Sequence, residues 1–262
     1  MINQIHLGDC LDLMYGIEDG CVDLICADLP YGTTKNKWDV VIPFAPLWAH
    51  YNRVIKPTGI IVLTSAQPFT TDLINSNRKY FRYDMIWYKA LGTGFLNSKK
   101  MPMRNHEHIS VFYKKPGTYN PQMGFGKRKS GMRKNDRNGG CYNDFNNNRV
   151  AKYDDEGTRH PQSVIDISNG DRTKESDHST QKPELFIRYL VKTYSNEGDL
   201  VLDNCIGNGT TAAACIEENR NFIGIEKDPK EFAKAIKRIS ILQAQTKLFA
   251  PEQKLAEQTN LF

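Results

Sequence analysis

The residues best suited to do chemistry are Asp28, Leu29, Pro30 and Tyr31, which close a short apolar run that begins at Val22. Such a run is typical of a buried parallel strand, and open α/β sheets bind their ligands where these strands end. An acid, a proline and an aromatic residue at such a place would suit a reaction at the exocyclic amino group of adenine or cytosine. This group is a poor nucleophile, because its lone pair is delocalised into the ring. The Asp28 carboxylate and the Leu29 carbonyl, held by the rigid bond to Pro30, could accept both N–H bonds and stabilise developing positive charge. Tyr31 could stack on a base that has been taken out of a duplex.

A second group of residues, 203–212, joins an expected strand to an expected helix with the sequence DNCIGNGTTA. Gly207 and Gly209 allow the backbone to approach a ligand closely, and the helix start behind them presents free N–H groups to an anionic group. Glu226 closes the next strand, where a carboxylate can accept both hydroxyls of a ribose. This context favours an adenosine-containing ligand. The string also fits the G-x-G-x-x-A pattern of nicotinamide-binding enzymes, and the two glycines alone could serve a tight turn.

Asp9 and residues 30–32 each have a simpler structural explanation. Asp9 follows a short strand and precedes a helix, so alone it would be an N-cap, although its carboxylate could also accept from an adenine amino group. Residues 30–32 would be an ordinary turn in isolation. Two ligand-sized sites in one chain favour the functional interpretation of both. Residues 106–108 read His-Glu-His, but no further ligand cluster accompanies them, so we expect no metal site.

Strand and helix patterns alternate along both halves of the chain and place these residues at strand ends. Strands are expected near residues 3–7, 22–28, 59–64, 83–89, 108–114, 200–203 and 221–226. Helices are expected near residues 10–17, 43–56, 67–77, 183–194, 210–219 and 229–242. This alternation predicts a wound α/β sheet with a hairpin-like piece near its edge.

The ordered set of motifs resembles the amino-methylating DNA methyltransferases that use S-adenosylmethionine, in the β-type order of catalytic, target-recognition and cofactor motifs. Gly8-Asp9-Cys10 and Asp28-Leu29-Pro30-Tyr31 resemble the catalytic opening of that family. Residues 178–183 (HSTQKP) resemble its (H)-x-T-Q-K-P motif, residues 203–211 its D-x-x-x-G-x-G-T motif, and Glu226 its ribose-binding acid. The motifs span residues 8–228 in one order, which makes the joint match specific.

The resemblance implies a Rossmann-like, doubly wound methyltransferase sheet with helices on both faces and a small irregular target-recognition insertion. It implies transfer of a methyl group from S-adenosylmethionine to the N6 amino group of adenine in a specific double-stranded DNA sequence, with base flipping. DNA methylation and restriction–modification are the implied settings, and whether a nuclease accompanies the chain is open. The implied catalytic residues are Asp28, Leu29, Pro30 and Tyr31. The implied cofactor-binding residues are Asp9, Asp28, Thr180, Lys182, Asp203, Gly207, Gly209, Thr210 and Glu226.

Two positions depart from the pattern of the family. Leu29 replaces the commoner proline of D-P-P-Y, but the acceptor there is a backbone carbonyl, so we expect activity to survive. Ile206 stands where a bulky apolar residue, sometimes Phe, precedes the first glycine, so the contacts to the cofactor adenine could differ. The leading Asp28 favours adenine N6 over cytosine N4 as a tendency of the family, and cytosine N4 is the nearest alternative. A nicotinamide-dependent oxidoreductase and a DNA-binding module without catalysis are alternatives of other classes.

Residues 114–152 hold ten Lys and Arg residues and two acids, whereas the whole chain has a net charge of +5. One concentrated basic segment with interspersed aromatic residues predicts docking of a polyanion, a solvated charge run being the alternative. We expect residues 114–178 to form a target-recognition insertion in a catalytic domain of residues 1–113 and 179–249, followed by a flexible tail over residues 250–262. The residues expected to contact DNA are Lys35, Lys37, Lys127, Arg128, Lys129, Arg133, Lys134 and Arg137.

Length and composition fit a globular protein. The chain has 262 residues, of which 39% are hydrophobic and 25% charged, so it can bury a sizeable core. No apolar run approaches the ~20 residues of a membrane span, and six cysteines without a C-x-x-C pair indicate a reduced cytoplasmic protein. The resemblance implies a bacterial or phage-encoded one. We expect no membrane partner, and the resemblance favours a homodimer. Residues Gln258–Phe262 (QTNLF) resemble the short peptides that dock bacterial sliding clamps, which makes a clamp a candidate partner.

Overall fold

The computed structural model describes residues 1–34, 36, 38–126, 130–132, 152–154, 157–169 and 182–249. The chain divides into two compact units, one formed by Met1–Asn120 and Ser163–Phe262 and the other by Pro121–Gln162. Within the described residues, no helix combines the length and the apolar character needed to cross a membrane.

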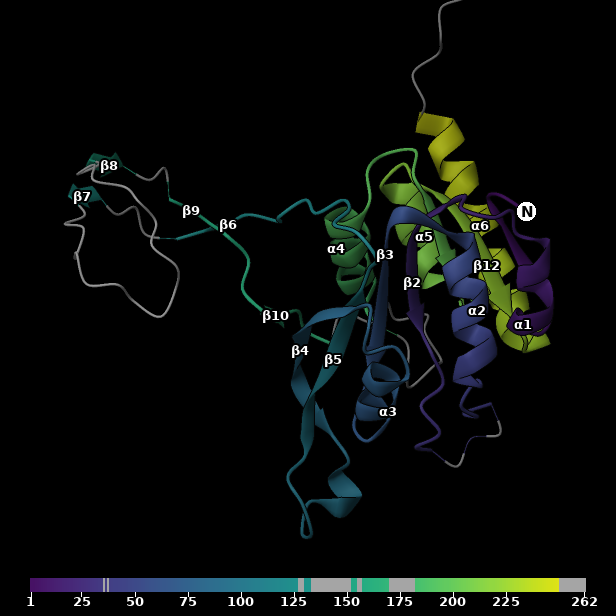
Figure 1. Cartoon of the computed structure of the whole chain (residues 1–262), viewed down its shortest axis with the longest axis horizontal. Coiled ribbons are helices and arrows are strands. Elements are labelled where there is room, and N and C mark those ends of the chain that lie inside the picture. Colours follow the sequence, from purple (N-terminus) through teal and green to yellow (C-terminus); the bar gives the residue numbers. More distant parts are fainter. Residues whose placement is uncertain are drawn as a thin grey trace, which may run out of the picture. The chain divides into compact units, whose positions relative to one another are not determined.

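An eight-stranded sheet forms the centre of the larger unit, in the order β1-β12-β11-β2-β3-β5-β4-β10 (Figure 1). Its strands are β1 (Gln4–Leu7), β2 (Val22–Asp28), β3 (Ile55–Ser65), β4 (Phe81–Thr93), β5 (Arg104–Phe112), β10 (Val164–Asp166), β11 (Leu200–Asp203) and β12 (Asn221–Glu226). The first five strands in the spatial order run parallel, and β5 pairs antiparallel with both β3 and β4. The parallel strands therefore all end at one edge of the sheet.

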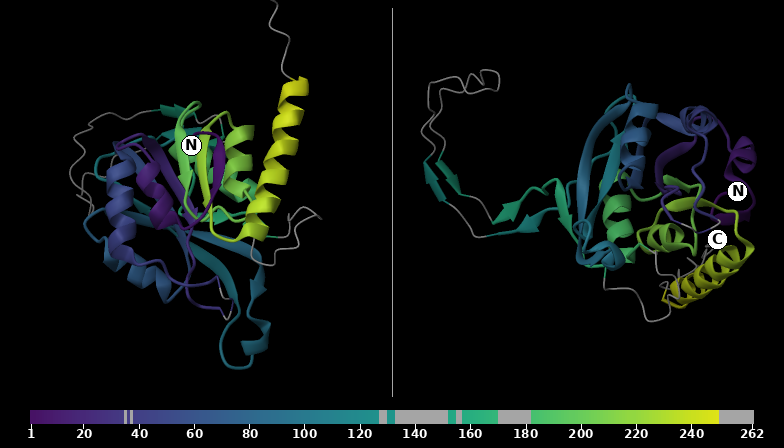
Figure 2. Two further views of the ribbon diagram at one scale, coloured as in Figure 1. Left: turned by 90° about the vertical axis from the view of Figure 1, so that its right-hand side faces the viewer. Right: turned by 90° about the horizontal axis from the view of Figure 1, so that it is seen from below.

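Helices cover both faces of this sheet (Figure 2). They are α1 (Cys10–Leu13), α2 (Phe44–Val54), α3 (Phe69–Ser76), α4 (Glu184–Tyr194), α5 (Thr210–Glu217) and α6 (Pro229–Phe249). Residues of α1, α2 and α3 belong to one buried cluster, and residues of α4, α5 and α6 belong to the other. The predicted doubly wound α/β fold is thus confirmed.

The central strands are buried on both faces, which explains their nearly continuous apolar sequences. Along β2, Leu24 and Cys26 face the cluster of α4, α5 and α6, whereas Ile25 and Ala27 face the cluster of α1, α2 and α3. The same alternation continues on β3. Because successive side chains point to opposite faces, a polar residue at the end of such a strand has a defined side of the sheet.

A short strand, β10, extends the sheet at its edge beside β4, although the sequence pattern did not mark it. Its three residues pair parallel with β4, with Ile165 opposite Trp87, and the Trp87 indole donates to the Ile167 carbonyl at 2.8 Å. A strand of three residues is too short to show periodicity.

The smaller unit contains two short antiparallel pairs. They are β6 (Gly124–Phe125) with β9 (Thr158–Arg159) and β7 (Ser130–Met132) with β8 (Lys152–Asp154). The proposed role of residues 114–178 in recognising DNA stays a prediction.

Candidate active site

Five neighbouring strands each place one polar residue on the sheet face that α4, α5 and α6 cover. On β2, Asp28 follows Leu24 and Cys26 at alternate positions of this face, at the carboxyl end of the strand. On β3, Thr64 lies directly opposite Asp28 in the register. We call the five residues the polar row, and in the order of the strands β11, β2, β3, β5 and β4 they are Asp203, Asp28, Thr64, Glu107 and Lys89.

Asp28 is held by three donors. Its Oδ1 accepts from the Tyr31 hydroxyl at 2.6 Å and from the Thr64 hydroxyl at 2.5 Å, while its Oδ2 accepts from the Lys182 ammonium at 2.6 Å. The Asp28 side chain is still 35% exposed, so its carboxylate remains within reach of a ligand. The carboxylate is therefore fixed in orientation without being sealed off.

The charges around Asp28 alternate in sign. Lys182, which lies just before α4, also pairs with Glu107 at 3.0 Å, and Glu107 pairs with Lys89 at 2.8 Å. Burial alone would raise the pKa of Glu107, but the charges of Lys182 and Lys89 outweigh it and lower the pKa to about 2. Burial alone would lower the pKa of Lys182, but Asp28 and Glu107 raise it above its ordinary value. We call Asp28, Lys182, Glu107 and Lys89 the charge array, in which two acidic side chains pair with two lysines.

Tyr31 lies between the charge array and α3. Its ring stacks on Phe69, with the ring centroids 5.3 Å apart and an angle of 24° between the planes. Burial, and then the negative charges of Asp28 and Glu107, raise the pKa of the Tyr31 phenol well above its ordinary value. The hydroxyl therefore stays protonated and donates to Asp28, and one face of the ring is taken by Phe69.

The loop after Tyr31 is organised by one carboxylate. Asp39 accepts the backbone N–H groups of Gly32, Thr33 and Thr34 at 2.8, 2.9 and 2.7 Å. Gly32 has a φ of +67°, and a Cβ there would lie 2.8 Å from the Val41 side chain. These contacts fix the chain direction directly behind the predicted catalytic residues.

Leu29 and Pro30 connect Asp28 to Tyr31. The Leu29 side chain is buried in the cluster of α1, α2 and α3. Among the hydrogen bonds of the described residues, none uses the Leu29 carbonyl as acceptor. This carbonyl, one residue after Asp28, is thus left available in the part of the chain that the structure describes.

Asp203 organises the loop that follows β11. Its Oδ1 accepts from the Cys205 N–H at 3.0 Å and its Oδ2 from the Thr211 hydroxyl at 2.6 Å. Burial, with smaller contributions from the charges of Asp28 and Glu226, raises the pKa of Asp203 to about 7. Because Asp28 influences Asp203, the loop and the charge array belong to one electrostatic environment.

Glu226 closes the same loop from β12. Its Oε2 accepts from the Gly207 N–H at 2.8 Å and its Oε1 from the Asp228 N–H at 2.7 Å. Burial raises the pKa of Glu226. Gly207 has a φ of +56° with open space at the position of a Cβ, whereas Gly209 has a φ of +87° and faces Ala235 on α6 at 3.2 Å. Both glycines supply the left-handed backbone that the loop requires.

Thr210 follows this loop directly, and Asp9 contacts the residue after Glu226, Lys227. Thr210 is the first residue of α5, and its hydroxyl donates to Asn208 at 3.1 Å. Asp9 caps α1 by accepting the Leu11 N–H at 2.9 Å, and it also pairs with Lys227 at 2.8 Å. The hydrogen bond from Lys227 lowers the pKa of Asp9. Asp9 therefore has the N-cap role that its sequence position suggested, and a contact to cofactor stays a prediction.

The structure brings together most of the predicted residues in two adjoining groups. Lys182, expected among the cofactor-binding residues, lies in the catalytic group because it pairs with Asp28. Predicted site residues outside the described residues are Thr180, Lys35, Lys37, Lys127, Arg128, Lys129, Arg133, Lys134 and Arg137, together with the clamp motif Gln258–Phe262.

Sequence reasoning missed Thr64, Phe69, Lys89 and Glu107 as members of the site. A signal existed for two of them. Lys89 continues the buried alternation of Met85 and Trp87 on β4, and Glu107 stands in the same relation to Ile109 and Val111 on β5. A charged residue on an apolar face is expensive unless it is paired, so two opposite charges on the buried faces of neighbouring strands predict an ion pair.

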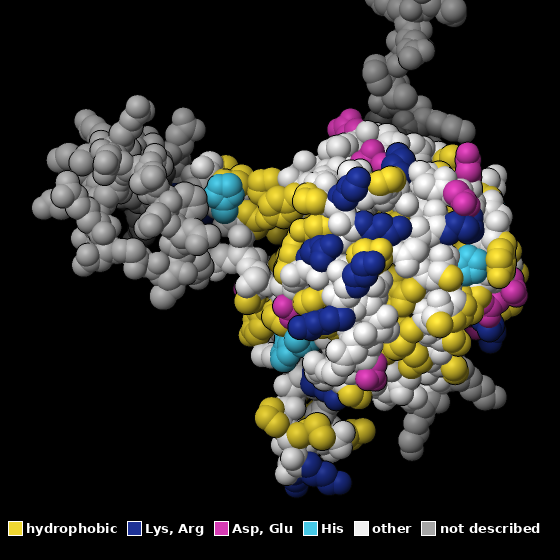
Figure 3. All heavy atoms as spheres, in the orientation of Figure 1, with side chains coloured by type: hydrophobic (Ala, Val, Ile, Leu, Met, Phe, Trp, Pro, Cys, Tyr) yellow, Lys and Arg dark blue, Asp and Glu magenta, His cyan; other side chains and the backbone are white. Residues whose placement is uncertain are grey.

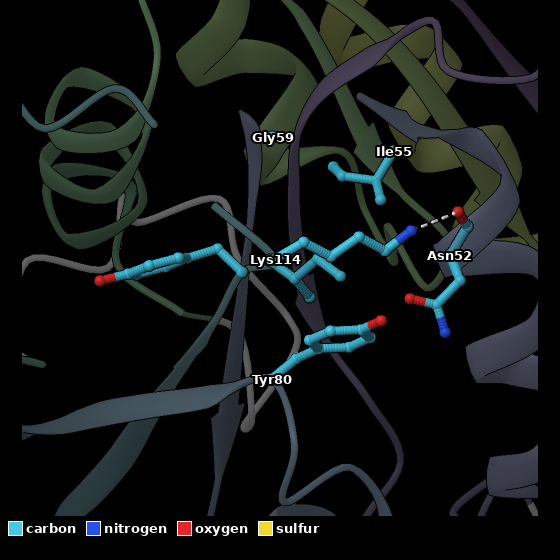
Figure 4. A pocket seen from close by; sticks show the side chains of 7 residues that line it. Asn52, Ile55, Gly59, Tyr80 and Lys114 are labelled. Carbon is cyan, nitrogen blue, oxygen red and sulfur yellow. Dashed lines mark hydrogen bonds between the residues drawn. The ribbon is translucent and has the colours of Figure 1, made fainter. Parts of the chain in front are cut away.

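A small hollow lies elsewhere on the sheet, toward the amino end of β3 (Figure 4). It is lined by Asn52, Ile55, Gly59, Ile61, Tyr80, Tyr113 and Lys114. The Lys114 ammonium donates to the Asn52 carbonyl at 3.0 Å. This hollow is at the opposite end of β3 from Thr64 and contains none of the predicted site residues.

Comparison with known sequences places this geometry among DNA-modifying enzymes. The sequence model of the N6/N4 family described as DNA methylase matches residues 22–238. The type II methyltransferase M.HpaI of Haemophilus parainfluenzae is 27% identical over 251 residues, covering 89% of this chain and 74% of the relative. The DNA adenine methyltransferase YhdJ of Escherichia coli (strain K12) is 28% identical over 253 residues, covering 90% and 82%.

Solved structures share the fold. The M1.HpyAVI complex with S-adenosylmethionine has a TM-score of 0.60 at 23% identity and covers 90% of this chain and 98% of its own. The cytosine-N4-specific PvuII DNA methyltransferase has a TM-score of 0.65 at 14% identity and covers 92% and 91%.

Proposed function

The chain belongs to the N6/N4 DNA methylase family, and we propose that it methylates the N6 amino group of adenine in a specific sequence of double-stranded DNA. Membership of this family makes the chain a DNA methyltransferase that uses S-adenosylmethionine. What is proposed is the base, the flipping of that base, and the role of each residue. The observation that carries the proposal is Asp28 at the end of β2, oriented by Lys182, Thr64 and Tyr31.

The loop between Asp203 and Thr210 fits the methyl donor. S-adenosylmethionine supplies a methyl group already activated on a positively charged sulfonium. A site for it should therefore attract a positively charged ligand and bind the hydroxyls of a ribose. Within the described part of the chain, neither Asp203 nor Glu226 is paired with a cation, and burial raises the pKa of both carboxyl groups. We propose that Glu226 binds the ribose hydroxyls, and that Asp203, Gly207, Gly209 and Thr210 shape the loop around the donor.

Asp28 and the Leu29 carbonyl provide the two acceptors that a target amino group needs. Lys182 and Thr64 hold the Asp28 carboxylate in place, so little reorganisation is required when an N–H group arrives. An amino nitrogen with both N–H bonds accepted moves toward tetrahedral geometry, and its developing positive charge lies against the Asp28 carboxylate. We assign Asp28 and Leu29 to this role.

Tyr31 and Phe69 form the stacking platform. Because Phe69 covers one face of the Tyr31 ring, a flipped base would stack on the opposite face. Base stacking on an aromatic residue stabilises a base outside the duplex, and the Tyr31 hydroxyl keeps the ring fixed through Asp28. Pro30 fixes the chain direction between the Leu29 carbonyl and this ring.

Adenine is preferred as the target base on two grounds. The leading residue of Asp28-Leu29-Pro30-Tyr31 is an aspartate, which within the family is commoner in adenine enzymes. The relative YhdJ, aligned over 90% of this chain, is named a DNA adenine methyltransferase. Cytosine N4 is the second candidate, because the cytosine-N4-specific PvuII enzyme shares the fold with a TM-score of 0.65.

The remaining alternatives are weaker. Membership of the methylase family leaves no role for a nicotinamide cofactor, and the intact charge array argues against a DNA-binding module without catalysis. The named relatives come from bacteria, so we place the enzyme in the bacterial cytoplasm, where the type II relatives suggest a restriction–modification setting. Dimerisation and clamp binding stay predictions.

Identification of the modified base tests the proposal. The protein is expressed in a host without adenine or cytosine methylation, and the genomic DNA is digested to nucleosides and separated by mass spectrometry. The expected product is N6-methyladenine, and N4-methylcytosine would overturn the adenine assignment while leaving the methyltransferase activity intact. Expression of Asp28→Ala in parallel controls for background, since this variant should yield neither base.

A further inference from the structure

A hairpin arm, residues 90–103, connects β4 to β5 and extends away from the sheet (Figure 1). The ladder between the two strands shifts register between Tyr88 and Thr93, and a 3-10 turn, Phe95–Asn97, forms the tip. Gly94, with a φ of +90°, starts this turn. The arm is built from backbone hydrogen bonds and has little core of its own.

The tip of the arm exposes large apolar side chains. Leu96 is 97% exposed and Phe95 is 74% exposed, and Leu91 and Met101 are also exposed. The space-filling view shows these apolar side chains gathered on the arm, with basic side chains beside them (Figure 3). Clustered apolar groups held away from the core are costly in water and mark a contact site.

The charge of the arm is positive throughout. Lys99, Lys100 and Arg104 lie on it or at its base, and the sequence has no acid between Asp84 and Glu107. An apolar tip flanked only by cations matches a polyanion that also offers a flat apolar surface, which describes stacked base pairs between phosphates. A protein partner would have to complement the same combination.

The arm starts at the catalytic edge of the sheet. Ser65, the last residue of β3, pairs with His108, so the residues of β5 before His108 project beyond the carboxyl end of β3. Lys89 and Glu107 stand at the root of the arm and pair with each other, and Glu107 pairs with the Lys182 that holds Asp28. The root of the arm is therefore part of the charge array.

We propose that the hairpin arm is a DNA-binding element that enters the duplex beside the target base. Phe95 and Leu96 occupy the space that the base leaves when it flips toward Asp28, and Lys99 and Lys100 bind phosphates on either side. Apolar side chains inserted between base steps are a general means of unstacking a duplex, and filling the gap favours the flipped state. The inference rests on DNA as the substrate and does not depend on whether the base is adenine or cytosine.

The tip is tested with the variant Phe95→Ala/Leu96→Ala in the full chain. The probe is a short duplex with the recognition sequence mapped from modified host DNA and a fluorescent base analogue at the target position. Loss of the tip should reduce the fluorescence increase on binding. It should also lower kcat/KM for methyl transfer to the same duplex with its natural target base by about tenfold, the usual scale for removing base stacking. Affinity for S-adenosylmethionine should not change. The control Ile236→Ala/Ile241→Ala removes two exposed apolar side chains of α6 and should leave the fluorescence unaltered.

The cations are tested with Lys99→Ala/Lys100→Ala. Each lost phosphate contact should reduce the slope of log affinity against log salt by about 0.9, so this variant should lower the slope by about 2. The control Lys230→Ala/Lys237→Ala, on exposed positions of α6, should keep the slope of the unaltered protein.

A second copy of this chain is the competing occupant of the arm. If Phe95→Ala/Leu96→Ala converts a dimer to a monomer in sedimentation while base flipping and the salt slope stay unchanged, the arm is a protein contact and the proposal is wrong. Unchanged flipping without any change in assembly also overturns it. The base is identified separately from host DNA, so a cytosine product would correct the proposed function and leave this inference standing.

Discussion

The two halves of the site are built in different ways. The proposed catalytic half consists of side chains from five separate stretches of sequence, represented by Asp28, Thr64, Lys89, Glu107 and Lys182. The proposed cofactor half is mainly backbone, because the loop from Asp203 to Thr210 is contiguous and is closed by Glu226 through hydrogen bonds to N–H groups. The catalytic half depends on long-range packing, whereas the cofactor half depends on local backbone conformation.

The electrostatics of the halves differ in the same way. The charge array is neutral as a set, with each cation placed between carboxylates or beside one. Among the residues that the structure describes, the carboxyl groups of Asp203 and Glu226 accept from N–H and hydroxyl donors and pair with no cation, and burial raises the pKa of both. A neutral array can hold its geometry without ligand, while a site with uncompensated acids gains most when a cationic donor binds.

The largest effect should come from Lys182→Met, which leaves Asp28 and Glu107 facing each other without the cation between them. The Lys182 side chain is only 10% exposed, and breaking a buried pair costs about 3 kcal/mol of unfolding free energy. Urea unfolding measures this loss, and methyl transfer should fall with it. Lys192→Met removes an exposed lysine of α4, 3.7 Å from Glu218, and should change neither. Equal unfolding free energies for Lys182→Met and the unaltered protein would show that the charge array does not stabilise the fold.

A smaller effect is expected from Gly209→Ala, which tests the backbone half alone. The left-handed φ of +87° and the contact with Ala235 should cost about 1–2 kcal/mol and misalign the loop N–H groups. Loss of one such hydrogen bond should weaken S-adenosylmethionine binding by about tenfold, measured by calorimetry. Gly20→Ala is the matched control, because Gly20 has a φ of +61° with open space around it and lies outside the loop. Equal weakening by both substitutions would mean that the loop has no special role.

A further difference between the two halves is expected in the pH dependence of stability. Glu107 has a pKa lowered from 4.5 to about 2, so the stability it contributes is present above pH 4.5 and is lost as the pH falls toward 2. Asp203 has a pKa raised from 3.8 to about 7, so its relative contribution is present below pH 3.8 and is lost as the pH rises through 7. In a plot of unfolding free energy against pH, Glu107→Gln should lose the slope at the acid end and Asp203→Asn the slope near neutrality. The same slope in both variants would contradict the assigned pKa shifts.

The difference between the halves also explains how much could be predicted from sequence. The conformation of the loop over residues 203–210 could be expected from sequence, because its glycines, helix start and closing acid follow one another along the chain; its contacts to cofactor stay a prediction. The alternation of strands and helices predicted the doubly wound sheet for the same local reason. In the proposed catalytic half, residues 28–31 were predicted and Lys182 was expected to bind cofactor. Glu107 and Lys89 were missed, since their proximity comes from the pairing of β5 with β3 and β4. Lys182 lies beside Asp28 although the two are 154 positions apart in the sequence.

The proposed role of Asp28 is tested most directly by comparing Asp28→Ala with the unaltered protein in single-turnover methyl transfer and in S-adenosylmethionine binding. The matched control is Asp23→Ala, which removes a carboxylate from the same strand that also pairs with a lysine, Lys56 at 2.7 Å, at the opposite end. If Asp28 accepts the target amino group, Asp28→Ala should slow transfer by about 100-fold or more while cofactor affinity and DNA binding stay near their original values. Transfer at the original rate by Asp28→Ala would contradict the assignment of Asp28 as the acceptor of the target amino group.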